Sequence, residues 1–103
     1  MTVAPKKLSQ DAFFRIAKAL SDPRRCEILE RIAPTQEMCC MHLARRLPVT
    51  QATISHHLKE LATAGLLTIR REGQFAYYRF CPDILDSYLT ELKRRMCALR
   101  KNS

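Results

Sequence analysis

The sequence predicts a mainly α-helical domain with one small β-hairpin. Apolar residues recur at helical spacing over most of the 103 residues, and proline or glycine separates the helical segments. Between residues 67 and 80 the period changes to strand-like alternation. A chain of this length forms one domain with a modest core. We expect that domain over residues 9–98, between a flexible N-terminal tail, 1–8, and a C-terminal tail, 99–103.

The first two helices have clear start signals. Ser9 can cap a helix that ends near Leu20. Asp22 followed by Pro23 is typical of the start of a second helix, with Asp22 as the N-cap and Pro23 at the first helical position. We expect this helix over residues 23–33, because Pro34 blocks its continuation.

A helix-turn-helix follows. A third helix is expected over residues 36–47 and ends before Pro48. Thr50 is the expected N-cap of a fourth helix, which ends at Gly65. One face of the fourth helix is apolar, with Ile54, Leu58 and Leu61 at helical spacing. The other face presents small polar residues at its N-terminal end, a pattern that suits the major groove of DNA.

The C-terminal third predicts a hairpin and a long helix. Residues 67–70 alternate, 71–74 form a turn with a basic tip, and 75–80 are aromatic and strand-like. Pro82 opens a last helix whose apolar stripe is complete, which predicts packing on a second copy of the chain or on the first helix. The candidate homodimer interface comprises Phe13, Phe14, Leu85, Tyr88, Leu89, Leu92 and Met96.

Charge indicates the class of partner. The formal net charge is +8 and the sequence pI is about 9.7, which favours a polyanion. No apolar run approaches the ~20 residues of a membrane span, and we expect neither a signal peptide nor a membrane partner. The cytoplasm is the expected compartment, where five cysteines, an odd number, favour thiols or ligands over disulfides. A thiol oxidoreductase is not expected, because Cys39-Cys40 is not a Cys-x-x-Cys pair, and we predict no enzyme.

The order of these elements is the winged-helix plan, and the motifs resemble one family. The segments concerned are Ala19-Leu20-Ser21-Asp22-Pro23-Arg24-Arg25, Ile28-Leu29, Gln51-Ala52-Thr53-Ile54-Ser55-His56-His57-Leu58 and Arg71-Glu72-Gly73-Gln74-Phe75-Ala76-Tyr77-Tyr78. Over residues 9–98 the chain resembles the ArsR/SmtB family. The resemblance implies a winged helix-turn-helix of order α-α-α-α-β-β-α. It also implies a homodimeric repressor that binds an inverted repeat and is released by an inducer, often a metal or metalloid ion.

The residues themselves give a candidate double-stranded DNA interface. Glutamine can pair with adenine at two points, and hydroxyls can meet several base edges. Arginines of the hairpin would reach the backbone or minor groove, and those of the third helix would meet phosphates if that helix crosses the backbone. The set is Thr50, Gln51, Thr53, Ser55, His56 and Lys59, with Arg45, Arg46, Arg70, Arg71 and Gln74. His57, at the edge of the apolar face, is expected to be a hydrogen-bonded structural residue.

The cysteines are the candidate inducer site. Metalloid sensors of the family carry Cys-x-Cys in a segment similar to Glu-Leu-Cys-Val-Cys-Asp-Leu, whereas this chain has Glu37-Met38-Cys39-Cys40-Met41-His42-Leu43. Met41 replaces the second cysteine, so the usual three-thiolate site is altered. Cys39 and Cys40 remain candidate ligands for As(III), Sb(III) or another thiophilic ion. If both cysteines lie in one helix, their side chains point about 100° apart. In the alternative interpretation, Cys39 and Cys40 bind no ion and are core residues.

Two other signals stay open. Some family members sense oxidants through one cysteine on the second helix and one on the last helix, an arrangement that Cys26 and Cys97 resemble loosely. Alternatively, the chain is a constitutive DNA-binding module that binds no ligand. The zinc site that relatives build on the last helix is absent, because Asp86-Ser87-Tyr88 is followed by no histidine.

Overall fold

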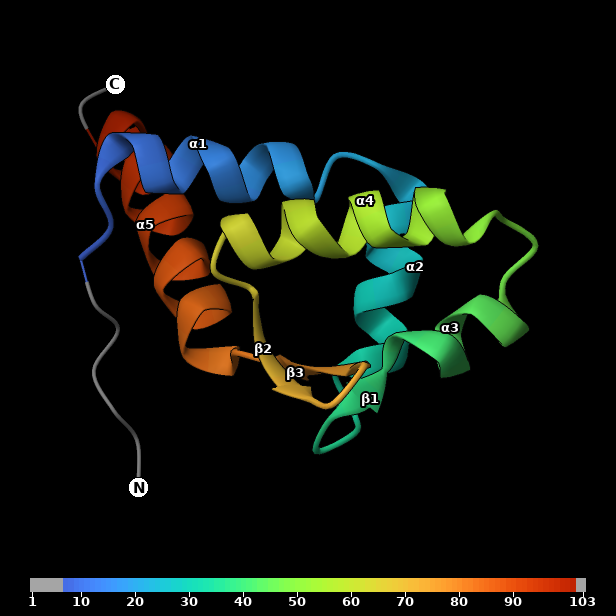
Figure 1. Ribbon diagram of the computed structural model, residues 1–103. Helices are drawn as coiled ribbons and strands as arrows, with labels where there is room; N and C mark the ends of the chain where they lie inside the picture. The colour runs from blue at the N-terminus through green and yellow to red at the C-terminus, as the bar shows by residue number, and fades with distance from the viewer. Residues whose placement is uncertain (1–6, 102–103) are drawn as a thin grey trace.

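The structure is a computed structural model that describes residues 7–101, and side chains only through residue 98. Most of the predicted N-terminal tail, and the side chain of Leu99, therefore lie outside the described residues. The elements are α1 (Gln10–Ala19), α2 (Pro23–Ile32), β1 (Met38–Cys39), α3 (Cys40–Arg46), α4 (Gln51–Thr63), β2 (Leu67–Glu72), β3 (Phe75–Phe80) and α5 (Pro82–Lys101), as Figure 1 shows. The predicted winged helix-turn-helix is confirmed.

The three predicted N-caps are present. The Ser9 hydroxyl accepts a hydrogen bond from the Ala12 amide at 3.1 Å, and the Asp22 carboxylate accepts one from the Arg25 amide at 3.0 Å. Thr50 does the same for α4, accepting from the Thr53 amide at 3.2 Å. Each cap satisfies an amide that the first helical turn leaves unpaired.

Arg25 explains why an arginine follows the Asp-Pro start of α2. Its guanidinium is buried and donates to the carbonyls of Lys18 and Ala19 at 3.2 and 3.3 Å. These carbonyls close the C-terminal end of α1, where a positive charge is favoured. The residue therefore joins the end of α1 to the start of α2.

The core lies between the helices and one face of the sheet. Its most completely buried side chains come from α1 to α4 and from the residue immediately before β2: Ile16, Ile28, Ile32, Leu43, Ile54, Leu58, Leu61 and Leu66. The apolar face predicted for α4 is thus confirmed, and it fixes which side of that helix remains at the surface.

The sheet has a strand that the sequence did not predict. Its order is β1-β3-β2, with all pairs antiparallel. Met38 pairs with Tyr78 and Cys39 with Tyr77, so the third helix begins at Cys40 rather than at residue 36. Pairing with the aromatic strand β3 overrides the helical spacing of this short segment.

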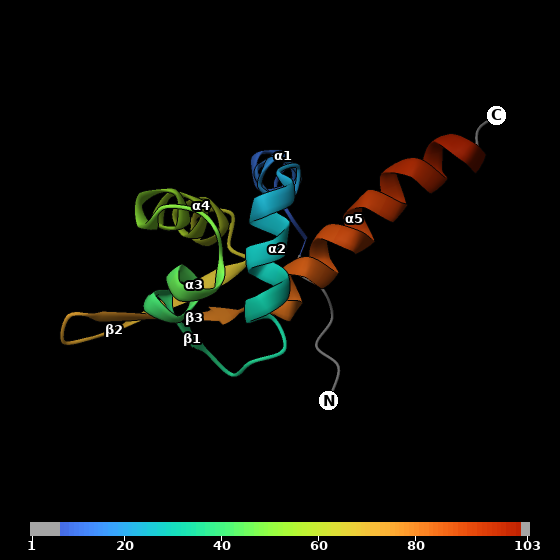
Figure 2. The same ribbon diagram turned by 90° about the vertical axis from the view of Figure 1, so that its right-hand side faces the viewer.

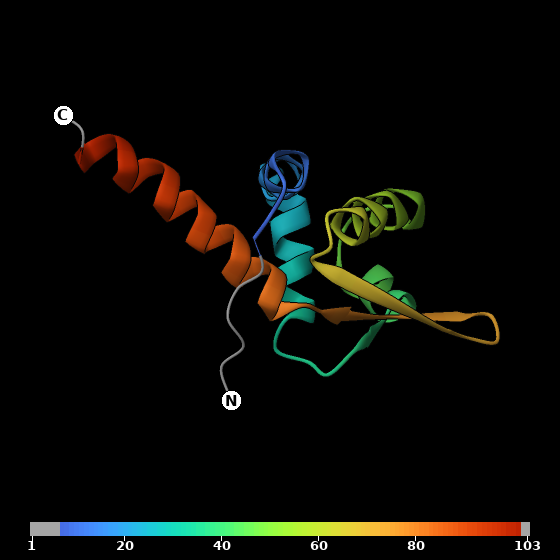
Figure 3. The same cartoon turned by 90° about the vertical axis from the view of Figure 1, so that its left-hand side faces the viewer.

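The β2–β3 hairpin, the wing, and α5 extend in opposite directions from the helical body (Figures 2 and 3). Helix α5 continues through Lys101, past residue 98, the expected end of the domain. Within the described residues, no helix is both long enough and apolar enough to cross a bilayer.

Candidate nucleic-acid interface

The polar face of α4 is at the surface. All six residues predicted there, Thr50, Gln51, Thr53, Ser55, His56 and Lys59, are exposed. The Thr50 hydroxyl accepts the cap bond and also donates to the Thr53 hydroxyl at 2.9 Å, so it stiffens the helix start. Arg45 and Arg46 are exposed in the last turn of α3, immediately before the turn that leads to α4.

The wing presents its two arginines on opposite faces. Antiparallel partners share a face, and successive residues alternate. Arg71 pairs with Ala76 and shares the face of Tyr78, which is turned toward α4, whereas Arg70 pairs with Tyr77 on the outer face. The hairpin turns at Gly73, whose φ of +60° favours glycine, and Gln74 beside it is exposed.

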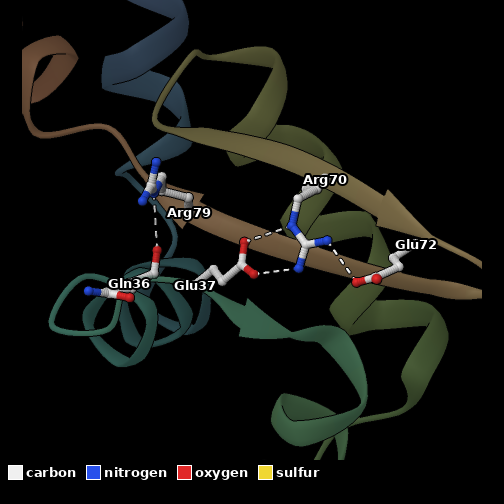
Figure 4. Close-up of polar contacts among 5 residues, drawn as sticks. All are labelled: Gln36, Glu37, Arg70, Glu72 and Arg79. Atoms are coloured by element: carbon white, nitrogen blue, oxygen red, sulfur yellow. Dashed lines mark hydrogen bonds and ion pairs between the residues drawn. The ribbon is translucent and has the colours of Figure 1, made fainter.

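Arg70 is held within the chain (Figure 4). Its guanidinium donates to the two carboxylate oxygens of Glu37 at 3.2 and 2.5 Å, and to Glu72 at 2.8 Å. It also lies 4.5 Å from the ring centroid of Tyr77. The carboxylates raise the pKa of Arg70, and Arg70 lowers the pKa of Glu37. Arg70 is therefore a predicted DNA contact whose guanidinium the fold already engages.

The same side of the sheet carries a second tie. Arg79 donates from Nε to the carbonyl of Gln36 at 3.2 Å (Figure 4). Together with the Arg70–Glu37 pair, this bond fastens the segment before β1 to the wing strands.

A groove of about 620 Å³ separates α4 from the wing, and we call it the α4–wing groove. It brings together four of the predicted DNA contacts with residues of α3 and β3. Its lining comprises Ser55, Lys59, Ala62 and Thr63 of α4, Ile69, Arg71, Gln74, Ala76 and Tyr78 of the wing, and Cys40 of α3.

The predicted cysteine pair is divided between the two faces of the sheet. Cys39 is the last residue of β1, in register with Tyr77 and Arg70 on the outer face. Cys40 starts α3 and lines the α4–wing groove. The assumption that both cysteines lie in one helix is therefore wrong, because Cys39 is in a strand. All five cysteines are free and half-buried, and Cys40 packs against the core. The described residues contain no group of three His, Cys, Asp or Glu side chains that could hold a metal ion.

Cys26 is less suited to reaction. Its thiol donates to the carbonyl of Leu20 at 3.1 Å, and burial, with Glu30 and Asp22 nearby, raises its pKa. Burial raises the pKa of the Cys81 thiol as well. Both groups are therefore held in the protonated form, which is the weaker nucleophile.

His57 is buried, as expected, but its Nδ1 has no hydrogen-bond partner in the described part of the chain. The expectation of a hydrogen-bonded histidine is wrong for this atom. Burial lowers the pKa of His57, and the neighbouring charges of Asp22 and Arg25 act in opposite directions.

The predicted dimer residues separate into two groups. Phe13 is only 4% exposed, because its ring stacks on Tyr88 at 5.1 Å between centroids and Arg95 lies 4.1 Å from its centroid. It belongs to the contact between α1 and α5 within one chain, and Leu85 and Tyr88 also pack against that chain's core. The exposed members are Phe14, Leu89 and Met96, at 53%, 50% and 57%, and Leu92 is half-buried.

Two residues of this region were not predicted from the sequence. Tyr78 lines the groove, and Glu37 holds Arg70. Alternation along the predicted strand 75–80 could have placed Tyr78 on the face of Ala76. No local signal could have placed Glu37 beside Arg70, because the contact spans 33 residues and depends on β1.

Comparison with known proteins gives consistent results. A helix-turn-helix domain model matches residues 20–70. The arsenic resistance transcriptional regulator of Pseudomonas putida is 39% identical over 67% of this chain, a match that spans 54% of the relative, about half its length. The arsenical resistance operon repressor of Bacillus subtilis is 33% identical, over 82% of this chain and 78% of its own.

A solved structure supports the same assignment. The homodimeric winged helix-turn-helix DNA-binding domain of a possible ArsR-family regulator from Mycobacterium bovis aligns with a TM-score of 0.68 and 29% identity, over 84% of this chain and 86% of that one. These relatives are named as regulators rather than as enzymes, in agreement with the prediction that this chain is not an enzyme. The motifs, the fold and the relatives together show that the chain belongs to the ArsR/SmtB family of winged helix-turn-helix transcriptional regulators.

Proposed function

We propose that the protein is a dimeric repressor that binds an inverted-repeat operator in double-stranded DNA and is released by an inducer. The N-terminal residues of α4 enter the major groove, where Gln51, Thr53, Ser55 and His56 meet base edges and nearby phosphates. Lys59, Arg45 and Arg46 bind phosphates, and Arg71 and Gln74 of the wing lie on the backbone or in the minor groove.

The α4–wing groove is the observation that carries this proposal. It is open and lined from both sides by side chains that donate to phosphate, Ser55 and Lys59 from α4 and Arg71 and Gln74 from the wing. A DNA strand passing between the major groove and the adjacent minor groove needs such a channel between the two contacting elements. The net charge of +8 supports attraction to the duplex.

Dimerisation supplies the second half-site. Phe14, Leu89 and Met96 form an exposed apolar face along α1 and α5, and a second copy would bury it. A two-fold dimer then presents two α4 helices to half-sites about one helical turn apart.

The inducer is a thiophilic metalloid such as As(III) or Sb(III), taken up through Cys39 and Cys40. Arsenical resistance regulators among the relatives support this choice, and thiolates are the ligands that such ions prefer. Because the two thiols lie on opposite sides of the sheet, one ion can bind both only if the junction of β1 and α3 rearranges. That junction adjoins the wing strand β3, so a rearrangement there would disturb the DNA-contacting surface.

Two alternatives predict different responses. A redox signal through Cys26 and Cys97 is disfavoured by the hydrogen bond and the raised pKa of Cys26. A constitutive DNA-binding module would show tight binding that no thiophilic species affects.

Fluorescence anisotropy tests the proposal. The reduced protein is titrated onto DNA from upstream of its own gene, with unrelated DNA as the control, and As(III) is then added to the complex. We expect preferential binding to the upstream DNA and release by As(III). The Cys39→Ser, Cys40→Ser double variant should bind the same DNA but resist release. Equal binding to both DNAs would contradict the repressor, and release of the double variant would contradict the inducer site.

A further inference from the structure

The α4–wing groove contains one cysteine among the DNA-contacting residues. Cys40 is half-buried, and its neighbours along the groove include Ser55, Lys59, Arg71 and Gln74. Cys39, the adjacent residue, is equally half-buried but lies on the outer face of the sheet. Two adjacent thiols of similar exposure therefore differ in whether they share a cavity with the DNA interface.

Tyr78 is a second sign that the groove accepts a ligand. Only 8% of the residue is exposed, and Tyr78 lines the same groove. Its hydroxyl makes no hydrogen bond to any residue in the described part of the chain, and it is not among the polar atoms sealed from the surface. A buried tyrosine usually places its hydroxyl against a partner, so this oxygen is available to a group that enters the groove.

The charges beside Cys40 favour partially negative groups. Lys59 and Arg71 line the groove from opposite sides, and neither forms an ion pair in the described part of the chain. A carbonyl oxygen in the groove can therefore accept a hydrogen bond from the Tyr78 hydroxyl or from either cation. These donors would orient a small electrophile whose carbonyl is conjugated to its reactive carbon, so that this carbon faces the thiol.

We propose that Cys40 is a site of covalent modification by small α,β-unsaturated carbonyl electrophiles, and that the adduct blocks DNA binding by occupying the α4–wing groove. This inference rests on the proposed DNA-binding function and is independent of metalloid binding. It differs from a chelated inducer because a single thiol suffices and the junction of β1 and α3 does not need to rearrange.

The step is a conjugate addition. Cys40 gives up its thiol proton to solvent, and the sulfur attacks the β-carbon of the electrophile. A C–S bond forms, the C=C π bond breaks, and its electron pair passes through the enolate to the α-carbon, which takes a proton from water. No oxidant or reductant is consumed, and no group leaves. The adduct stays in the groove, where a DNA backbone would otherwise meet Ser55, Lys59 and Arg71.

Alkylation with N-ethylmaleimide provides the test. Wild-type protein, Cys40→Ser and the matched control Cys39→Ser are each alkylated, and peptide mass spectrometry identifies the labelled sites. The affinity of each for DNA from upstream of its own gene is then compared with that of its own unmodified form. We expect alkylation to weaken binding by wild type and Cys39→Ser by at least about tenfold, and binding by Cys40→Ser by less than about twofold.

Protection from labelling gives a readout that does not depend on affinity. Bound DNA should slow labelling of Cys40 severalfold and leave labelling of Cys39 unchanged. The inference is overturned if fully labelled wild type binds as well as the unmodified protein, if alkylated Cys40→Ser loses binding equally, or if Cys40 does not react. Failure of the unmodified protein to prefer the upstream DNA would instead contradict the proposed function.

Discussion

Glu37 and Arg70, 33 residues apart in sequence, form a two-point ion pair across the outer face of the sheet. Glu72 holds the same guanidinium from the wing itself, and the ring of Tyr77 lies beneath it. Arg70 was predicted to contact DNA. We now expect it to position the wing on the segment before β1 and to leave the groove-side contacts to Arg71 and Gln74.

Replacing Glu37 by glutamine should free Arg70 for DNA. The variant loses one negative charge next to the wing, so its affinity for non-specific DNA should rise. The slope of log K for DNA binding against the logarithm of the salt concentration should steepen by up to about one. The free energy of unfolding should change little, because the ion pair is exposed. Binding isotherms at several salt concentrations measure the slope. The control is Glu27→Gln, which removes the same charge from the Arg24–Glu27 pair on α2. Equal slopes for both variants would show that Arg70 does not reach DNA.

Base and phosphate contacts should respond differently to substitution. Gln51→Ala should cost about 1–3 kcal/mol of binding free energy on the operator and little on unrelated DNA, because a glutamine that pairs with adenine recognises sequence. Arg46→Gln should weaken binding to both DNAs and reduce the salt slope by about one. Parallel titrations on the two DNAs distinguish these outcomes. A loss of affinity for unrelated DNA in Gln51→Ala would reassign that residue to phosphate.

The exposed face of α5 should control the oligomeric state. A glutamate at Leu89 would place an unpaired charge in the centre of the proposed interface, so Leu89→Glu should be monomeric at concentrations where wild type is dimeric. Sedimentation velocity measures this directly. Thr90→Glu introduces the same charge at an exposed position about 100° around the helix from Leu89, so it is the matched control and should remain dimeric. A dimeric Leu89→Glu protein would place the interface elsewhere.

Stability should decline in mild acid because of His57. Burial lowers the pKa of its imidazole, so the folded chain favours the neutral ring, although Asp22 opposes this and Arg25, Arg24 and His56 support it. The contribution is complete above the unfolded-state pKa of about 6.5 and is lost as the pH falls through the lower pKa of the folded state. Thermal unfolding at pH 7.5 and 5.5 should show a smaller difference in Tm for His57→Leu than for wild type. A difference in Tm for His57→Leu as large as that for wild type would contradict this role of His57.

A second acid transition should appear at much lower pH. Hydrogen bonds from Arg94 and Arg95 lower the pKa of Glu91 to about 2 from an ordinary value of 4.5. Its contribution is complete above about pH 4.5 and is lost as the pH falls toward 2. Unfolding curves between pH 5 and 2 for wild type and Glu91→Gln would distinguish the contribution of Glu91 to the pH dependence of stability from that of His57. An identical acid dependence in both would contradict the assignment.

The helices could be predicted because their signals are local. Ser9, Asp22 and Thr50 are caps that act on amides three residues away, and the apolar face of α4 follows from the spacing of Ile54 and Leu58. The exposure of the residues proposed to contact DNA followed from the same spacing. What the sequence could not reveal depends on contacts between distant segments. Strand β1 exists because β3 is beside it, and the placement of Cys39, Cys40 and Glu37 follows from that pairing.

The angle at which α5 leaves the domain has a consequence for the length of the operator. This 20-residue helix spans about 30 Å, and Tyr88 and Arg95 hold its middle part against Phe13 of α1. In a dimer joined through α5, a small rotation at that contact would carry the two α4 helices apart or together. The bases read within each half-site would stay the same, while the number of base pairs between half-sites would change. We therefore expect the packing of Phe13, near one end of the chain, to influence which operator spacings the protein accepts.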